Sequence, residues 1–274
     1  MQINEHSYTL QAADGIQLVG RVDAPDEPKA AVVIVHGLCE HFGRYDYVVE
    51  QLMAVGYAVV RFDHRGHGRS MGKLTYFADR TQIVDDTHLF VEDARARFPE
   101  LPLFMIGHSM GGFGAASYGT AHPGELDGYV LSGAWTRDHR GLALVDDALP
   151  SDEYVPNALG AGVCSDPAVG EAYAADPLVA KEFSVGLLRA VHDGHDWLCA
   201  NAAAFVDPVS IMHGGDDGLV DPQDSIDFFE EIGSTDKSLR IYAGLCHEIF
   251  NEFKRDRVIR DAIDWLDDHA VCAQ

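Results

Sequence analysis

Residues 107–111 read "GHSMG", and this pentapeptide decides how the rest of the chain is interpreted. It follows the apolar run of residues 101–106 and precedes a stretch rich in glycine and alanine, so it lies where a predicted strand passes into a predicted helix. Gly107 and Gly111 have no Cβ to clash in such a turn, which can hold Ser109 in a strained conformation with its hydroxyl projecting from the sheet edge. Because GxSxG alone also fits a serine that N-caps a glycine-rich helix, partner residues must be found elsewhere.

Strands and helices alternate along most of the chain. Two extended segments within residues 6–25, joined at Asp14 and Gly15, predict a hairpin and an antiparallel edge. Apolar runs typical of buried strands occupy residues 30–35, 57–63, 101–107, 126–135, 206–215 and 238–244. Segments with helical spacing occupy residues 45–56, 81–98, 109–123, 224–233 and 255–270. The alternation predicts an α/β fold with a mostly parallel eight-stranded sheet flanked by helices.

Residues 136–201 interrupt this alternation. The segment carries four prolines and no β/α rhythm, and it contains several short apolar patches. Ligands of open α/β sheets bind at the carboxyl ends of the strands, where an insertion between strand and helix would lie. We therefore expect a helical cap, or lid, at residues 136–201, inserted into a core made of residues 1–135 and 202–274.

Charge and cysteine content exclude several classes of protein. The 274 residues include 44 acidic and 20 basic side chains, and the formal charge of −24 repels nucleic-acid phosphates and anionic membrane surfaces. No run approaches the roughly 18 apolar residues of a membrane-spanning helix, and no signal peptide is apparent, so no stable membrane insertion is expected. Five scattered cysteines without CxxC spacing favour free thiols and a cytoplasmic location, namely Cys39, Cys164, Cys199, Cys246 and Cys272.

Partners for the serine follow it in the chain. A serine hydroxyl needs a base to remove its proton, and the base needs a third group to fix its tautomer. Asp216, Asp217 and Asp221 come just after one predicted strand, and His247 comes just after the next. The order serine, acid, histidine is typical of a nucleophile elbow. Asp217 is the preferred acid, since Asp216 and Asp221 also fit turn formation and helix capping.

The remaining parts of an acyl-transfer site can also be assigned. A tetrahedral oxyanion needs amide donors, one from the residue after the nucleophile and one from a loop after an early strand. Met110 and Leu38 are the candidates, Leu38 because it follows Gly37 in the loop "HGLCEH". Since "HEIFN" after His247 lacks the second histidine of a zinc helix, we expect no metal and no cofactor.

Longer segments resemble a known family. They include "VHGLCEHFGRYDYVVEQLMAVGYAVVRFDHRGHGRSMG", "IGHSMGG", "SDPAVGEAYAADPLV" and "IMHGGDDGLVDPQDS". With these motifs the chain is similar to the monoacylglycerol lipase and lysophospholipase group of α/β-hydrolases. The resemblance implies that Ser109 is the nucleophile, Asp217 the acid and His247 the base. It further implies that the Leu38 and Met110 amides form the oxyanion hole, and that residues 165–179 belong to the cap.

These observations predict a serine hydrolase that cleaves carboxylic esters, most simply monoacylglycerols or similar single-chain lipid esters, through an acyl-enzyme intermediate. Histidine's ordinary pKa predicts that activity rises between about pH 6 and 7. The sequence leaves open an esterase for short-acyl or phenolic-acid esters and a non-enzymatic binding module. It also leaves open a peptidase that grips a substrate ammonium group with cap acids such as Asp146, Asp147, Asp152 or Glu153.

Overall fold

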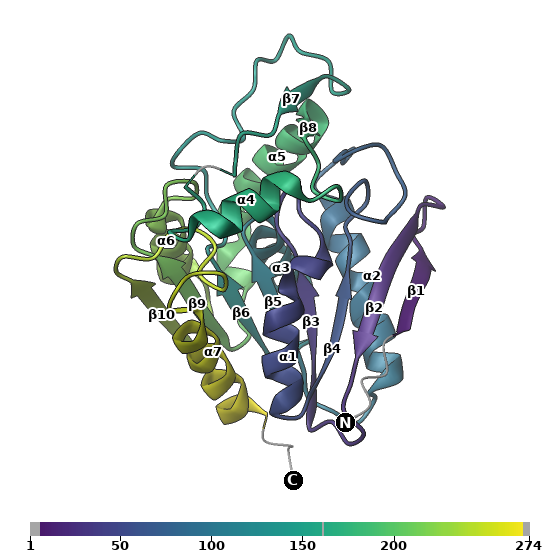
Figure 1. Cartoon of the computed structure of the whole chain (residues 1–274), viewed down its shortest axis with the longest axis vertical. Coiled ribbons are helices and arrows are strands. Elements are labelled where there is room, and N and C mark those ends of the chain that lie inside the picture. The colour runs from purple at the N-terminus through teal and green to yellow at the C-terminus, as the bar shows by residue number, and fades with distance from the viewer. Residues whose placement is uncertain (1–5, 161, 271–274) are drawn as a thin grey trace.

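A computed structural model describes residues 6–160 and 162–270 of the chain (Figure 1). Its main sheet is built from β1 (His6–Gln11), β2 (Gln17–Asp23), β3 (Ala30–Val35), β4 (Tyr57–Phe62), β5 (Leu103–His108), β6 (Gly128–Ser132), β9 (Val209–Gly214) and β10 (Lys237–Tyr242). The strand order is β1-β2-β4-β3-β5-β6-β9-β10. From β4 to β10 all neighbouring strands are parallel, so the predicted mostly parallel eight-stranded sheet is confirmed.

The antiparallel edge is the predicted hairpin. β1 pairs with β2, the register placing Gln11 opposite Gln17, and β2 continues antiparallel to β4. Gly15 has a φ of +88°, a conformation that suits glycine, and Asp14 accepts a hydrogen bond from the Ile16 amide. Local turn chemistry therefore sets this edge of the sheet.

Helices cover both faces of the sheet. Their bounds are η1 (Phe42–Tyr45), α1 (Asp46–Ala54), α2 (Thr81–Arg97), α3 (Met110–Ala121), η2 (Ala202–Ala204), α6 (Pro222–Glu231) and α7 (Arg255–His269). α1 and α7 lie side by side on one face, and α2, α3 and α6 cover the other (Figure 1). This three-layer arrangement is the one predicted from the alternation of strands and helices.

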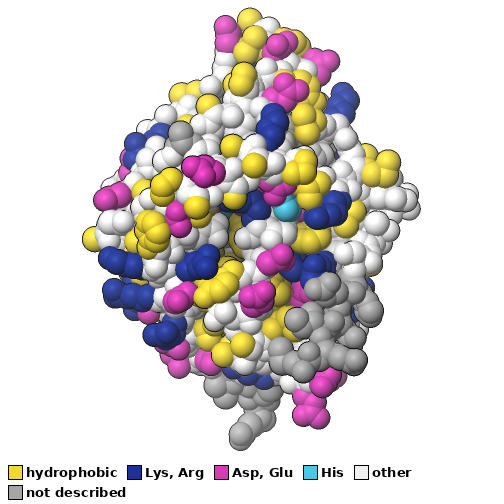
Figure 2. Space-filling model, in the orientation of Figure 1, with side chains coloured by type: hydrophobic (Ala, Val, Ile, Leu, Met, Phe, Trp, Pro, Cys, Tyr) yellow, Lys and Arg dark blue, Asp and Glu magenta, His cyan; other side chains and the backbone are white. Residues whose placement is uncertain are grey.

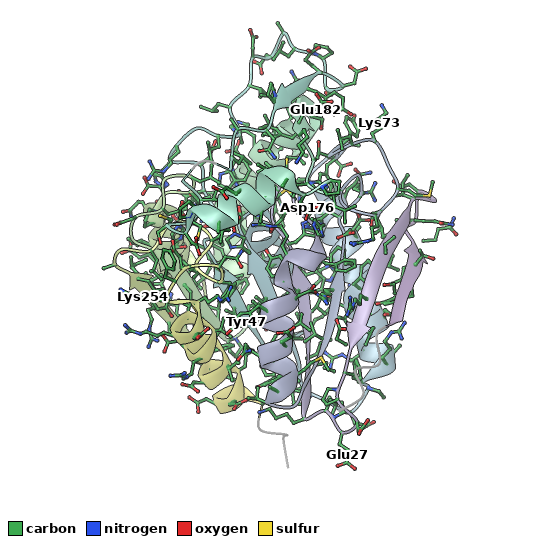
Figure 3. The ribbon with its side chains drawn as sticks, in the orientation of Figure 1. Glu27, Tyr47, Lys73, Asp176, Glu182 and Lys254 are labelled. Atoms are coloured by element: carbon green, nitrogen blue, oxygen red, sulfur yellow. The ribbon has the colours of Figure 1, made fainter. Side chains whose placement is uncertain are left out.

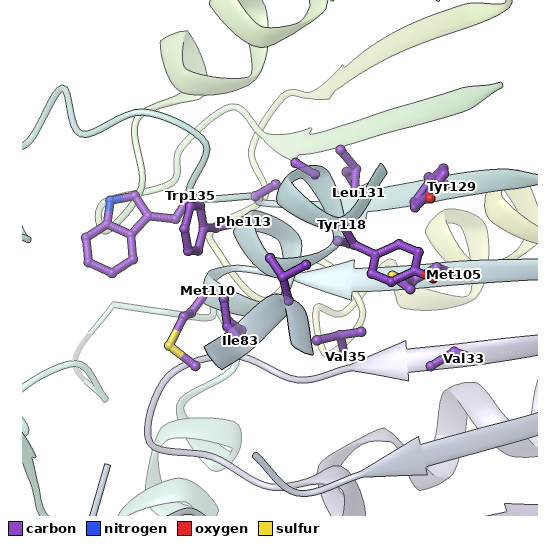
Figure 4. Packing of buried hydrophobic residues seen from close by; sticks show 14 of the residues in the cluster. Val33, Val35, Ile83, Met105, Met110, Phe113, Tyr118, Tyr129, Leu131 and Trp135 are labelled. Carbon is purple, nitrogen blue, oxygen red and sulfur yellow. The ribbon is translucent and has the colours of Figure 1, made fainter. Parts of the chain in front are cut away.

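The central strands are buried on both faces, which explains their continuous β-branched and apolar runs. On one side Val33 and Met105 pack with side chains of α2 and α3, and Figure 4 shows Phe113 and Tyr118 of α3 meeting this layer. On the other side Val32 packs under α1 and α7. Burying both faces fixes the sheet as a rigid platform for the loops at its carboxyl edge.

Residues 136–160 and 162–184 lie above the carboxyl ends of the strands, and the helix that ends the segment runs from there along α3 (Figure 1). This segment contains β7 (Tyr154–Pro156), α4 (Pro167–Ala175), β8 (Glu182–Ser184) and α5 (Val185–Asn201). β7 and β8 pair antiparallel in a small second sheet, an element that the sequence pattern did not indicate. The 17-residue α5 packs on the core helix α3, where the ring of His195 meets the ring of Phe113 at 5.1 Å.

The segment above the sheet is tied to the loop after β3. The Ala180 amide donates to the Cys39 carbonyl at 2.9 Å. His41 Nε2 lies 2.9 Å from a carboxylate oxygen of Asp176, which Figure 3 labels near α4. The Arg44 guanidinium lies over the ring of Tyr173, 4.9 Å from its centroid. These contacts connect the predicted cap directly to the predicted oxyanion loop.

The surface carries charges of both signs. Figure 2 shows acidic and basic side chains scattered among hydrophobic ones on the face that it presents. Within residues 6–160 and 162–270, no helix has the length and apolar character needed to cross a bilayer.

Candidate active site

Ser109 occupies a strained turn between β5 and α3. Its φ of +56° and ψ of −121° lie in a region that residues other than glycine rarely adopt. A Cβ on Gly111 would lie 2.1 Å from the Val35 carbonyl oxygen, and one on Gly107 would lie 2.5 Å from the Gly111 carbonyl oxygen. The turn therefore requires both glycines, and it presents a serine at the carboxyl edge of the central strand, as a nucleophile elbow does.

Asp217 lies in the turn after β9, and its carboxylate is held on both oxygens. Oδ1 accepts hydrogen bonds from the amides of Leu219 and Val220 at 2.8 and 2.9 Å, and Oδ2 lies 2.7 Å from Nδ1 of His247. The two neighbouring aspartates behave differently. Asp216 is exposed. Asp221 caps α6 by accepting from the amide of residue 223 at 3.0 Å. Of the three acids, Asp217 is the one that contacts His247.

His247 lies after β10 and faces the serine turn. Its ring lies 4.7 Å from the ring of His108, the residue before Ser109, and Ser109 and His247 line the same cavity. Because Nδ1 donates to Asp217, Nε2 is the nitrogen left for proton exchange. Asp217 contacts His247, and His247 shares a cavity with Ser109, so the three predicted side chains lie at one margin of the sheet.

Asp217 and His247 shift each other's protonation in opposite directions. Burial by itself raises the pKa of Asp217, but the charge of His247 and the hydrogen bonds from His213 and His247 bring it well below its ordinary value. Burial by itself lowers the pKa of His247, but the charge and hydrogen bond of Asp217 raise it above 6.5 overall. The pair therefore favours the charged form of each partner.

His213, at the end of β9, is a member of this network that the sequence reasoning missed. Its Nε2 lies 3.0 Å from Asp217 Oδ2 and 3.2 Å from the Val220 carbonyl, and its Nδ1 lies 2.7 Å from Ser225 Oγ. Since both neighbours of Nε2 are acceptors, Nε2 carries the proton and donates it. Asp217 Oδ2 is thus shared by two imidazoles, and the only sequence signal was a histidine that ends a strand four residues before the acid.

The loop after β3 carries Leu38, the predicted oxyanion donor, and it is braced by Glu40. Glu40 Oε1 accepts from the Gly37 amide and from the Tyr45 hydroxyl, each at 2.6 Å, while Oε2 accepts from Arg44 at 2.6 Å. The other predicted donor is Met110, the first residue of α3. Sequence reasoning missed the bracing role of Glu40, although the residue lies within the quoted "HGLCEH" motif.

Two cavities open from Ser109, and they differ in polarity. One is lined by apolar side chains, among them Trp135, Leu142, Leu159, Phe183 and Leu188. The other contains Glu40, Arg44, His108 and Glu248. Arg44 joins the two carboxylates, since its guanidinium donates to Glu40 and makes a two-pronged contact with Glu248 at 2.8 Å on each prong. Ser109 therefore lies where an apolar space meets a polar one.

The cysteines near the site are not activated. Cys39 is buried, and burial together with the nearby charge of Glu40 raises the pKa of its thiol. Burial also raises the pKa of Cys246, beside His247. The four cysteines within the described residues are free, and Cys272 lies outside those residues.

Comparisons with known proteins agree with this geometry. Residues 26–254 match the Hydrolase_4 family, described as "Serine aminopeptidase, S33". The chain is 36% identical to a monoacylglycerol lipase of Mycolicibacterium smegmatis, over 97% of this chain and 98% of that protein. It is 30% identical to human monoglyceride lipase, over 89% of this chain and 84% of that protein.

A solved structure shows the same fold. A soluble variant of Saccharomyces cerevisiae monoglyceride lipase, crystallised in complex with a substrate analogue, superposes with a TM-score of 0.86 at 26% identity. The match covers 99% of this chain and 98% of that one. By its sheet, its motifs and these matches, the chain belongs to the Hydrolase_4 family of α/β-hydrolases and is a carboxylic ester hydrolase.

Proposed function

We propose that the protein hydrolyses monoacylglycerols through an acyl-enzyme intermediate formed on Ser109. His247 removes the serine proton through Nε2 and later returns it to the leaving alcohol, while Asp217 holds the ring and stabilises the imidazolium. The amides of Leu38 and Met110 stabilise the oxyanion of the tetrahedral intermediate. A water molecule, deprotonated by His247, then releases the fatty acid, and no cofactor takes part.

The observation that carries this proposal is the position of Ser109 between the apolar and the polar cavity. A monoacylglycerol has one alkyl chain and one glycerol group on opposite sides of its ester. The side chains that line the apolar cavity are of the kind that contacts an alkyl chain, and Arg44 with its two carboxylates offers donors and acceptors to the glycerol hydroxyls. The two relatives and the solved structure named above carry the same activity in their names.

We further propose that residues 136–201 act as the cap over a core of residues 1–135 and 202–274. Leu142, Leu159, Phe183 and Leu188 all come from this segment and line the apolar cavity. The cap would thus supply much of the acyl-chain pocket. We also place the protein in the cytoplasm, a proposal that the free thiols support.

A peptidase is disfavoured by the position of the acids that would grip a substrate ammonium group. Asp146, Asp147, Asp152 and Glu153 are all exposed. Among the described residues that line the two cavities at Ser109, none is one of these four acids.

The substitution Ser109→Ala tests the nucleophile. It removes the attacking oxygen, so turnover of a monoacylglycerol such as monodecanoylglycerol should fall by about 10⁴-fold or more. Release of decanoic acid by the purified variant measures this. Retention of more than a few per cent of the activity would contradict the assignment.

The substitution Leu142→Trp tests the acyl pocket. Leu142 is half-buried and lines only the apolar cavity at Ser109, so a larger side chain should exclude long acyl groups. Relative to wild type, kcat/KM for decanoyl esters should fall about 10-fold while that for acetyl esters changes little. Leu144→Trp is the control, because Leu144 is 66% exposed. Equal loss on both esters would count against an acyl pocket here.

A further inference from the structure

Three side chains that can bind metal converge on the outer side of α2 and α3. His88 projects from the middle of α2, His122 is the C-cap of α3, and Glu125 lies in the turn that follows. One ligand atom from each lies within 4.8 Å of the others. We propose that these side chains form a binding site for a divalent transition metal ion, with Zn²⁺ as its occupant.

The distances are close to those of a zinc site. Ligand atoms bound tetrahedrally to zinc at about 2.0 to 2.1 Å lie about 3.3 Å from one another. His122 Nδ1 lies 3.2 Å from Glu125 Oε1, and His88 Nδ1 lies 3.8 Å from Glu125 Oε2. The two rings are stacked at 4.8 Å, so they must tilt for both nitrogens to face one ion. Their exposed fractions of 40% and 28% leave room for that rotation.

Neighbouring groups hold the ligands in place. Tyr118, one helical turn before His122, donates its hydroxyl to Glu125 Oε2 at 2.6 Å and lies 3.1 Å from His88 Nδ1. Arg95 of α2 donates to the main-chain carbonyl of Glu125 at 2.7 Å and so anchors the turn. Hydrogen bonds from Tyr118 and Arg95 orient Glu125, whereas an ion bound at His88 Nδ1 would replace the contact of that atom with Tyr118.

The local charge also suits a cation. His122 lies at the C-terminal end of α3, where unpaired carbonyls and the helix dipole favour positive charge. Charges of both signs lie near Tyr118, beside the cluster, since Glu92 raises the pKa of Tyr118 and Arg95 lowers it. Two imidazole nitrogens with one carboxylate oxygen suit zinc and its neighbours better than magnesium or calcium, which prefer oxygen ligands alone.

The site is separate from the proposed chemistry. Ser109 is the N-cap of α3 and His122 is its C-cap, and a helix of 12 residues is about 18 Å long. A bound ion would join α2 to the end of α3 and to the turn before β6. Its effect should therefore appear in the stability of the fold, whether or not the protein hydrolyses monoacylglycerols.

Thermal unfolding with and without ZnCl₂ tests the site. Cysteines are first alkylated, because Cys199 is exposed and thiolates bind zinc. At a zinc concentration one hundred times Kd, the Tm of the wild-type chain should rise by about 5 °C. His88→Gln and His122→Gln should each abolish this rise. His192→Gln, which changes a half-buried histidine of α5 outside the cluster, is the matched control and should keep it.

Three measurements make the result decisive. The Tm of each variant without metal shows whether that variant is folded. The substitution Glu125→Gln removes the charge of the third ligand but keeps a hydrogen-bond acceptor for Tyr118. Co²⁺ added to the alkylated wild-type chain should produce visible absorption bands of tetrahedral coordination that both histidine variants lack. If zinc raises Tm equally in all variants, or leaves that of the wild type unchanged, the three residues form only a hydrogen-bonded cluster and the proposal is wrong.

Discussion

One buried histidine of the candidate site and a cluster of three other buried histidines behave in opposite ways. His247 is fully enclosed, yet its pKa lies above the ordinary value of 6.5. His36, His64 and His67 form a cluster beside the oxyanion loop, with ring centroids 4.4 to 5.9 Å apart. Burial lowers the pKa of His36 and His64 well below 6.5 and that of His67 to about 4.

The difference lies in the acceptors that each ring meets. His247 donates to a carboxylate, whereas the cluster bonds to the backbone: His36 Nδ1 donates to the Gly37 carbonyl, and His64 Nε2 donates to the His36 carbonyl. Among the described residues, His64 Nδ1 and His67 Nε2 have no hydrogen-bond partner. A second proton on either ring would be a buried charge without an acceptor, so these rings stay neutral and serve as braces.

The substitution Asp217→Asn should have the largest effect on activity, because it leaves His247 without a carboxylate acceptor, as the three clustered histidines are. Loss of the carboxylate leaves the ring free to adopt the wrong tautomer, and kcat should fall by about 10⁴-fold. The ascending limb of kcat/KM against pH, which the raised pKa of His247 places above pH 6.5 in the wild type, should move to lower pH. Asp216→Asn, at the exposed neighbour, is the control and should change neither quantity. If the ascending limb does not move in Asp217→Asn, the carboxylate does not explain the difference between His247 and the clustered histidines.

The second-largest effect should be a loss of folding stability in acid, caused by the histidine cluster. A histidine whose folded pKa lies below its unfolded value contributes stability that is complete above pH 6.5 and is lost as the pH falls toward the folded pKa. For His67, with a folded pKa of about 4, the free energy of unfolding should drop by about 2 kcal/mol between pH 7 and pH 5. His247 has the opposite sign and offsets part of this loss.

Urea unfolding of the wild type and of His67→Gln at the two pH values measures that contribution. The variant should be less stable at pH 7 but should lose about 2 kcal/mol less than the wild type on going to pH 5. Identical pH dependence in the two proteins would show that folding leaves the pKa of His67 unchanged.

Substitutions of His213 should have the smallest effect. They test the same comparison, because His213 shares Asp217 Oδ2 with His247. His213→Leu removes one hydrogen bond from the carboxylate, which then attracts the His247 proton more strongly. We expect kcat to fall about 10-fold and the ascending pH limb to move upward. His213→Gln, which keeps a donor, should restore both. If the two variants have the same pH profile, His213 supports only the fold.

Much of the fold and part of the site could be predicted from local patterns. The glycines around Ser109, the β-branched run of β3 and the Asp14–Gly15 turn act through neighbouring residues, so the sequence shows them directly. The small sheet of β7 and β8 was not predicted, because strands of three residues leave almost no periodicity.

By itself the sequence determined the order of the elements and the order of Ser109, Asp217 and His247 at the carboxyl ends of strands, since strand runs and turn residues are local signals. Only the tertiary structure decided that Glu40 braces Gly37, that His213 shares Asp217, and that His88 meets Glu125. Spacing along the chain does not encode the direction of a side chain. The protonation of a buried histidine depends on the acceptor that folding places against it.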